Sequence, residues 1–196
     1  MQCIGKKNID IADLNIDLLS LGAHKFYGPK GIGALYIKNG TSINPLILGG
    51  GQEKGISPGT ENVALISGMA YALEIAIKNI TSSTSHINEM ESLFLKLLNQ
   101  TGIKYKVNGD NRLPGFLNIT FFDFDGHGLL LNLDMRNIAI SFGSACSSGS
   151  AKASNALLSI GMDKNTANST VRITIGSFIK KNDIINLVNT IKEIII

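Results

Sequence analysis

"SLGAHKFYGPKGIGALY", residues 20–36, is the stretch that decides the fold. Its pattern predicts two short buried strands, residues 15–21 and 32–38, joined by a glycine-rich turn that carries His24 and Lys25. A lysine amine attacks a carbonyl carbon only when it is deprotonated, which requires a desolvated or positively charged setting. A turn of this kind is able to hold such an amine, although most lysines in glycine turns simply face solvent.

The rest of the chain alternates strand-like and helix-like segments. Strands are predicted at 104–108, 115–122, 138–141 and 170–175, and helices are predicted after an N-cap at Thr60 and at about 86–100, 128–136, 154–160 and 181–196. The polar stretch at 81–85 is interpreted as a link between two units. The alternation predicts an α/β or α+β architecture. We also expect the strands at 115–122 and 170–175 to pair in one sheet.

The composition argues against several classes of protein. The chain has 196 residues, of which 44% are hydrophobic, enough for one substantial core or two small ones. A net charge of +3, with no basic run interleaved with aromatic residues, argues against nucleic acid as a partner. No apolar stretch reaches the length of a membrane span. Cys3 and Cys146 lie far apart in dissimilar contexts, so we expect a cytoplasmic protein with reduced thiols and no disulfide.

Cys146 stands in "SFGSACSSGS", residues 141–150, among small residues. A structural cysteine usually has bulky apolar neighbours, whereas a thiol that attacks a substrate needs an accessible setting. The sequence alone leaves a reactive and an inert Cys146 about equally open. Cys3 is interpreted as a small packing residue.

Arg172 lies inside the apolar strand "TVRITIG", residues 170–176. A guanidinium on a buried strand needs a carboxylate partner. The partner is either an Asp or Glu of the chain, which is the commoner case, or the carboxylate of a substrate. The loop "LGGGQEKGISPGT", residues 48–60, has the backbone freedom to surround an anion, but glycine triplets also occur in plain loops.

Several motifs occur together and in a fixed order. They are Gln2, His24-Lys25, Gly-Pro-Lys-Gly-Ile-Gly, a Gly-Gly-Gly loop that ends in Gly59-Thr60-Glu61-Asn62, Ser-Ala-Cys-Ser-Ser-Gly and Val-Arg-Ile-Thr-Ile-Gly. This combination resembles a cysteine desulfurase, a pyridoxal phosphate enzyme of the class-V aminotransferase family with an aspartate aminotransferase-like α/β fold. The serine- and glycine-rich cysteine loop is similar to the iron–sulfur assembly and nitrogen-fixation branch of that family.

The resemblance implies a set of cofactor contacts. Lys25 corresponds to the lysine that forms a Schiff base with pyridoxal 5'-phosphate and then moves the α-proton of the substrate. His24 is expected to contact the cofactor phosphate, and Gln2 to hydrogen-bond the pyridine 3-oxygen. Thr60 is expected to reach the phosphate of a neighbouring subunit in a homodimer. No metal ligand is implied.

The resemblance also implies how the substrate is handled. Arg172 is expected to bind the carboxylate of L-cysteine. Cys146 is expected to attack the substrate sulfur, which leaves L-alanine and a persulfide on the enzyme. The persulfide would then pass to a sulfur acceptor or iron–sulfur scaffold protein. Removal of selenium from selenocysteine is the alternative chemistry.

The family resemblance predicts the C-terminal half of such an enzyme. Residues 1–80 are expected to be the last part of the large cofactor domain, and residues 81–196 the small α+β domain that carries the cysteine loop. The aspartate that pairs with the pyridine nitrogen would precede Gln2, so we expect the chain by itself to bind the cofactor weakly and to turn over cysteine slowly. Two other functions stay open, a binding module without catalysis and a persulfide carrier that uses Cys146.

Overall fold

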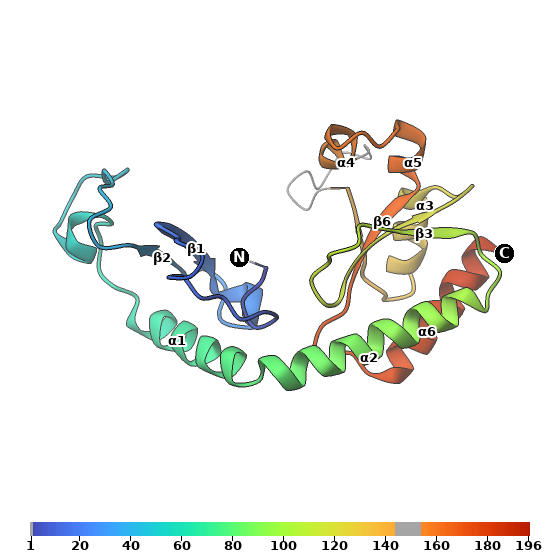
Figure 1. Ribbon diagram of the computed structural model, residues 1–196, viewed down its shortest axis with the longest axis horizontal. Helices are drawn as coiled ribbons and strands as arrows, with labels where there is room; N and C mark the ends of the chain where they lie inside the picture. Colours follow the sequence, from blue (N-terminus) through green and yellow to red (C-terminus); the bar gives the residue numbers. More distant parts are fainter. Residues whose placement is uncertain (1, 144–153) are drawn as a thin grey trace. The chain divides into compact units, whose positions relative to one another are not determined.

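The computed structural model describes residues 2–143 and 154–196, and Cys146 therefore lies outside the described residues. The chain forms two compact units, Met1–Ser83 and Thr84–Ile196, each with a sheet of its own (Figure 1). The assignment of these regions to a large cofactor domain and a small domain stays a prediction.

The first unit is built on an antiparallel hairpin. Strand β1 (Leu18–Gly22) pairs with β2 (Gly33–Ile37), and the 3-10 turn η1 (Ala23–Phe26) follows β1 directly. Helix α1 (Val63–Lys78) packs against η1. Both strands that were predicted around the Lys25 turn are present, but the prediction that they are buried is wrong, because none of their residues is buried and Leu18 and Leu35 are about half exposed.

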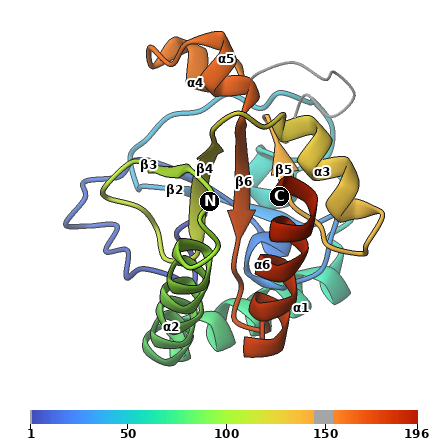
Figure 2. The ribbon, with the colours of Figure 1, turned by 90° about the vertical axis from the view of Figure 1, so that its right-hand side faces the viewer.

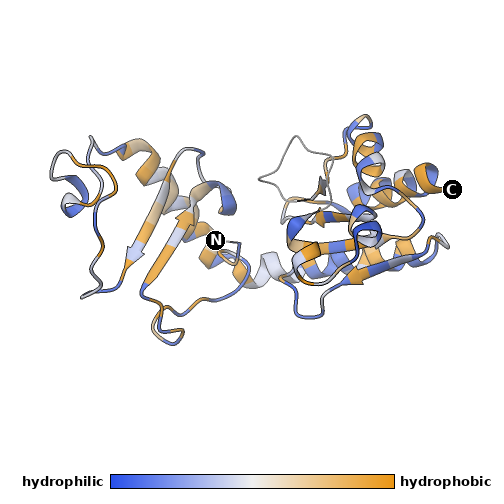
Figure 3. Cartoon of the chain, turned by 90° about the horizontal axis from the view of Figure 1, so that it is seen from above, coloured by the Kyte–Doolittle hydropathy of each residue, from blue (hydrophilic) through white to orange (hydrophobic). Residues whose placement is uncertain are grey.

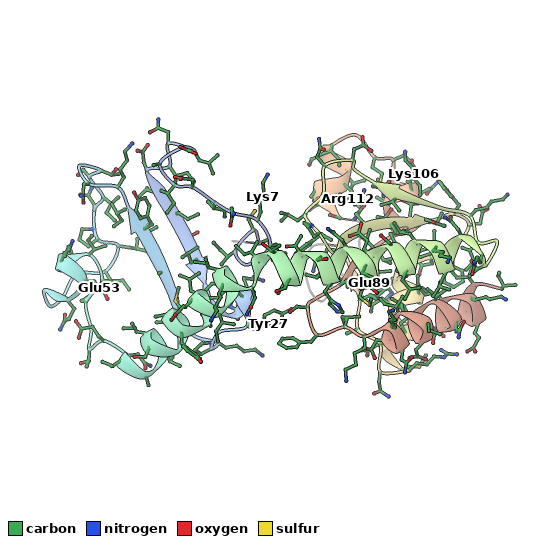
Figure 4. The ribbon with its side chains drawn as sticks, turned by 60° about the horizontal axis from the view of Figure 1, so that its bottom comes forward. Lys7, Tyr27, Glu53, Glu89, Lys106 and Arg112 are labelled. Atoms are coloured by element: carbon green, nitrogen blue, oxygen red, sulfur yellow. The ribbon has the colours of Figure 1, made fainter. Side chains whose placement is uncertain are left out.

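Helix α1 begins later than the sequence pattern predicted. Asn62 is its N-cap in place of Thr60, and the Asn62 side-chain oxygen accepts a hydrogen bond from the backbone N–H of Leu65 at 3.1 Å. The short 3-10 turn η2 (Gln52–Gly55) lies upstream in the glycine-rich loop. Glu53, labelled in Figure 4, adopts a left-handed backbone there with a φ of 50°.

The second unit contains a four-stranded antiparallel sheet in the order β3-β4-β6-β5. Its strands are β3 (Tyr105–Asn108), β4 (Phe116–Phe121), β5 (Ser141–Phe142) and β6 (Thr170–Thr174). β4 pairs with β6, and Asn118 lies opposite Arg172. The predicted pairing of these two strands is therefore confirmed.

Three helices cover one face of this sheet. They are α2 (Ile80–Asn99), α3 (Gly126–Asp134) and α6 (Lys181–Ile195) (Figures 1 and 2). Their apolar sides meet the inward side chains of β4 and β6, and Phe94, Leu117, Leu129 and Ile191 at the centre are fully buried. The short helices α4 (Asn155–Ser159) and α5 (Lys164–Asn168) precede β6.

The polar stretch at 81–85 does contain the boundary between the two units, as predicted, but it is helical and not a turn or loop. These residues form the first turns of α2. Serine and threonine have only moderate helix propensity, but they do not break a helix. The helix continues into a stripe at Ile87, Met90, Phe94 and Leu98 that buries one face against the sheet, and this burial stabilises the whole helix.

Helix α5 is an element that the sequence pattern did not predict. Asp163 is its N-cap, and the Asp163 carboxylate accepts a hydrogen bond from the backbone N–H of Thr166 at 3.0 Å. Hydrogen bonds from the side chain and backbone of Thr166 lower the pKa of Asp163. The sequence contains this N-cap pattern, Asp-x-x-Thr. The helix was missed because, at five residues, it is too short to show a periodic apolar pattern.

Glu91 on α2 holds the loop that leads into β4. Its Oε1 pairs with Nη2 of Arg112 at 3.1 Å, and its Oε2 accepts the backbone N–H of Gly115 at 2.9 Å. We expect Glu91→Ala to lower the free energy of unfolding of the second unit by about 1–3 kcal/mol, because it leaves a half-buried guanidinium and an N–H unsatisfied. Urea denaturation followed by circular dichroism measures this change.

Glu89 supplies the matched control on the same helix. Its carboxylate pairs with Lys181 at 3.2 Å, but both side chains are more than half exposed (Figure 4 labels Glu89 and Arg112). Glu89→Ala should therefore change the free energy of unfolding by less than about 1 kcal/mol. Equal losses in the two variants would contradict the role given to Glu91.

Two further findings concern residues 2–143 and 154–196 only. No single helix there is long and apolar enough to cross a membrane. Only α1 and α2 taken together, with a bend between them, have the length and apolar composition that a membrane span requires. No three His, Cys, Asp or Glu side chains come together in a way that would hold a metal ion.

Candidate functional site

Lys25 lies on η1, the four-residue turn that follows β1. Ala23 and Phe26 are 0% and 3% exposed and hold the two ends of the turn in the small core around Met69. His24 and Lys25 lie between these anchors and are exposed. Neither side chain forms a hydrogen bond or ion pair with another described residue, so both are available to a ligand that carries a phosphate and a carbonyl group.

Gly28 allows this turn to pack closely. A Cβ at position 28 would lie 3.0 Å from both the Cβ and the carbonyl oxygen of Ala23 and 3.2 Å from the Cβ of Ala72 on α1. The Gly28 N–H donates to the Ala23 carbonyl oxygen at 2.9 Å, and Tyr27 adopts a left-handed φ of 65° to close the turn. The sequence from Gly22 to Gly28 thus fixes the backbone that carries Lys25.

The structure does not bring the other predicted cofactor residues into contact with Lys25. Gln2 is exposed in a turn near the start of the chain. Thr60 is exposed and lines a groove of about 710 Å³ together with Leu21, Glu53 and other residues of the first unit. Lys25 does not line this groove. The roles predicted for Gln2, His24 and Thr60 therefore stay predictions.

The sheet of the second unit has one apolar and one polar face, because side chains alternate along each strand. On the polar face, one row of residues crosses all four strands, namely Asn108, Asn118, Arg172 and Ser141. The Asn108 Nδ2 donates to the Asn118 Oδ1 at 2.9 Å. At the other end of the row, the Arg172 Nη2 donates to the Ser141 Oγ at 3.0 Å. The row places the guanidinium in the middle of the polar face.

In the neighbouring row of the same face, the side chains form hydrogen bonds with other residues of the chain. Thr120 and Thr170 are buried, and their hydroxyl oxygens lie 2.7 Å apart. Thr170 also donates to the carbonyl oxygen of Thr166 at 2.7 Å, and Thr120 accepts from Asn108 at 3.0 Å. These hydroxyls stabilise the sheet and have little capacity left for a ligand.

Arg172 has no carboxylate partner among the described residues. The segment 144–153, which the structure does not describe, contains no Asp or Glu. The Nε of Arg172 is buried and has no hydrogen-bond partner within residues 2–143 and 154–196. A buried guanidinium nitrogen without a partner is costly in free energy. The Nε of Arg112 is unpartnered in the same way although Arg112 pairs with Glu91. It is therefore the lack of a carboxylate beside Arg172 that favours, of the two partners left open by the sequence, one from outside the chain.

Ser141 and Asn118 are the site residues that sequence reasoning missed. Ser141 lies in β5, five residues before Cys146 in the sequence, and its hydroxyl contacts Arg172. The signal for both residues was the alternation of polar and apolar side chains in the predicted strands. The alternation does not reveal which strands are neighbours, and the row becomes visible only when the strand order is known.

Comparison with known proteins shows to which protein family the chain belongs. The family model for aminotransferase class V matches residues 1–187. The chain belongs to the aminotransferase class-V family. Enzymes of this family use pyridoxal phosphate, and the predicted cofactor agrees with that membership.

Within the family, the chain is similar to proteins named cysteine desulfurase IscS. One from Clostridium botulinum strain Hall is 43% identical over 199 residues, which cover 100% of this chain and 50% of the relative. One from Dictyoglomus turgidum is 40% identical over 197 residues, with the same two coverages. The chain therefore spans about half the length of the curated relatives it matches.

Solved structures agree with this similarity and confirm the predicted fold class. A NifS-like protein from Rickettsia africae superposes with a TM-score of 0.88 at 30% identity, over 98% of this chain and 51% of that protein. A structure described as SspA in complex with cysteine superposes with a TM-score of 0.70 at 37% identity, over 90% of this chain and 49% of that protein.

Proposed function

We propose that this chain is the half of a cysteine desulfurase that supplies the lysine, the substrate-binding arginine and the reactive cysteine. The complete protein would convert L-cysteine to L-alanine and leave the sulfur as a persulfide on Cys146. The observation that carries this proposal is Arg172, whose guanidinium lies on the polar face of a sheet without a carboxylate partner among the described residues. Cysteine brings the carboxylate that this site lacks.

The available side chains fit pyridoxal 5'-phosphate. Lys25 offers an exposed amine for its carbonyl carbon, and His24 offers an adjacent exposed imidazole for its phosphate. Gln2 and Thr60 are both exposed and open to the cofactor contacts proposed for them. When bound, pyridoxal phosphate would supply an electron sink that stabilises negative charge on the substrate α-carbon.

Each residue of the chain then has one task. Arg172 binds the substrate carboxylate through charge-assisted hydrogen bonds, with its guanidinium held by Ser141. Lys25 removes and returns the α-proton. The Cys146 thiolate forms a sulfur–sulfur bond with the substrate sulfur while the carbon–sulfur bond breaks. The electron pair of the broken bond stays on the carbon, and protonation there completes L-alanine.

The proposal includes partners. The Cys146 persulfide would be taken up by an acceptor or scaffold protein for iron–sulfur cluster or thio-cofactor assembly. The protein would act as a homodimer in the cytoplasm, with Thr60 directed to the phosphate of the second subunit. The exposure of Thr60 on the rim of a groove supports this role.

The direct test is to incubate the chain with pyridoxal phosphate, L-cysteine and a thiol reductant, which releases the sulfur of the persulfide as sulfide, and to measure alanine and sulfide. Slow formation of both products, dependent on Lys25 and Cys146, is the expected result for the chain by itself. Persulfide on Cys146 that arises only with a donor protein would identify a carrier instead. Binding of partner proteins without either reaction would identify a module without catalysis. A preference for selenocysteine over cysteine would change the substrate and keep the residue roles.

Arg172 allows a sharper test of substrate binding. We expect Arg172→Ala to raise the KM for L-cysteine about 10- to 100-fold, because it removes charge-assisted hydrogen bonds to the carboxylate. Steady-state alanine formation at saturating pyridoxal phosphate measures the KM. Arg136→Ala is the control, since Arg136 lies in the turn after α3 and, among the described residues, its side chain donates only to the carbonyl oxygen of Asn132. An unchanged KM in Arg172→Ala would show that the carboxylate binds elsewhere.

A further inference from the structure

One polar residue beside Arg172 has no task in the proposed reaction. Asn118 on β4 lies directly opposite Arg172 on β6, and both are half-buried residues of the polar face of the sheet. Figure 3 shows hydrophilic and hydrophobic residues alternating along the strands of the second unit. Side chains that lie opposite each other on neighbouring strands are close enough to contact the same ligand. Asn118 is therefore placed to contact the ligand that the guanidinium binds.

A series of hydrogen bonds on this face has a fixed direction. A hydroxyl group has one proton to donate, and a carbonyl oxygen can only accept. The Thr170 hydroxyl donates its proton to the carbonyl oxygen of Thr166 at 2.7 Å, so it is the acceptor in its 2.7 Å contact with Thr120. The Thr120 hydroxyl is then the donor in that contact. Its oxygen has only lone pairs left for its other neighbour, the side chain of Asn108.

This direction fixes how two side-chain amides are turned. Asn108 must turn its NH2 group toward Thr120, which its Nδ2 contacts at 3.0 Å. The same nitrogen donates its second proton to the Asn118 side chain at 2.9 Å, and the atom that accepts there must be Oδ1. Asn118 therefore turns its oxygen toward β3 and its NH2 group away from β3. The neighbour of Asn118 on the other side is Arg172 on β6.

The NH2 group of Asn118 is available to a ligand. Among the described residues, the hydrogen bond of this side chain is the one that its oxygen accepts from Asn108. The guanidinium of Arg172 also contains donors only, and one of them is used by Ser141. Two neighbouring strands thus present donors side by side, and no carboxylate of the described residues accepts from Arg172. A carboxylate supplies the two acceptor atoms and the negative charge that such a pair of donors requires.

We propose that Asn118 is a second substrate-binding residue, whose Nδ2 donates to the same carboxylate that Arg172 binds. One oxygen of the carboxylate accepts from the guanidinium, and the other accepts from the amide. Asn108 is a positioning residue, because it fixes the orientation of the Asn118 amide. The inference rests on the proposed function and adds a source of specificity to it. A site made only of donors accepts both oxygens of L-cysteine but excludes the NH2 group of L-cysteine amide, which is itself a donor.

Asn118→Asp tests this role with little change of shape. One oxygen of the introduced carboxylate still accepts from Asn108, while the other replaces the donor and pairs with Arg172. We expect the KM for L-cysteine to rise at least about tenfold. The ratio of kcat/KM for L-cysteine to kcat/KM for L-cysteine amide should fall at least about tenfold, because the introduced oxygen repels a carboxylate and accepts from an amide. Formation of alanine and of alanine amide, with pyridoxal phosphate and a thiol reductant present, measures these constants.

Asn99→Asp is the matched control. It adds the same charge to the second unit, at the end of α2, and its side-chain oxygen also accepts a hydrogen bond, from the hydroxyl group of Tyr105 at 2.6 Å. We expect the KM and the substrate ratio to be those of the unchanged chain. Circular dichroism shows whether both variants are folded. If Asn118 only stabilised the sheet, Asn118→Asp would slow the reaction of both substrates equally, and an unchanged ratio would overturn the proposal.

A binding measurement separates this inference from the proposed reaction. The NH2 group of Asn118 gives a pair of NMR signals, which are assigned by their loss in Asn118→Asp. We expect L-cysteine, added to the full chain without pyridoxal phosphate, to shift this pair in a saturable way, and L-cysteine amide to leave it in place. A selective shift without alanine formation would support the role of Asn118 and contradict the proposed reaction. An unshifted pair, or the same shift with both compounds, would overturn the role of Asn118 whether or not alanine forms.

Discussion

Lys25→Ala is expected to abolish covalent retention of pyridoxal phosphate and to slow alanine formation about 10²- to 10⁴-fold. Lys25 is exposed on a turn whose two ends are held by the buried residues Ala23 and Phe26. Its backbone is therefore fixed, while its amine is accessible to a ligand. Reduction with borohydride followed by peptide mass spectrometry measures retention and identifies the modified residue. Alanine formation is measured in parallel.

Lys30→Ala is the matched control for this result. Lys30 is also exposed and lies five residues further along the same connection. It should retain the cofactor and the rate of the unchanged chain. Modification of Lys30, or equal retention in both variants, would show that Lys25 reacts only as one surface amine among others.

The exposure of Lys25 also predicts how tightly the chain holds the cofactor. A lysine becomes nucleophilic at neutral pH when it is desolvated or placed near positive charge. The described part of the first unit does not bury Lys25, so the chain by itself should hold the cofactor weakly. Absorbance titration with pyridoxal phosphate measures this affinity.

Local patterns predicted most of the elements but not their boundaries. The two strands around Lys25 followed from apolar runs and a glycine turn, whereas the pairing of β4 with β6 was an expectation about the whole fold. The unit boundary at 81–85 was predicted, but its helical conformation was not, because Ser and Thr there indicate a loop when the burial of Ile87 and Phe94 is unknown. Tertiary packing decided this boundary against the local composition.

The sequence predicted which residues belong to the candidate site, but only part of how these residues are arranged in space. The sequence marked Arg172 as a cation that needs a partner, but both an internal and an external carboxylate were open. The strand order favours the external carboxylate, because it places Asn118 and Ser141 beside the guanidinium where an Asp or Glu was also possible. Positions of Gln2, Thr60 and Lys25 relative to a cofactor depend on polypeptide beyond the described unit, and no local pattern determines them.

Cys146→Ser is the second substitution with a very large expected effect. We expect it to leave the covalent retention of pyridoxal phosphate by Lys25 unchanged and to reduce sulfur removal at least about 10²-fold. A hydroxyl is not ionised at neutral pH and does not form the sulfur–sulfur bond, whereas a thiol reaches its reactive thiolate form near neutral pH. The persulfide is measured as a mass increase of one sulfur atom on the peptide that contains Cys146, after alkylation.

Cys3→Ser separates this chemistry from general thiol reactivity. Cys3 is half-buried in the first unit and was interpreted as a packing residue, so its substitution should leave both the persulfide and the rate intact. Cys146→Ala should behave like Cys146→Ser, because both lack the sulfur that accepts the bond. If Cys146→Ser still released sulfide from L-cysteine at the unchanged rate, the sulfur would leave without a persulfide. The enzyme would then catalyse an elimination rather than a sulfur transfer, and Ser141 and Arg172 would bind a substrate for a different reaction.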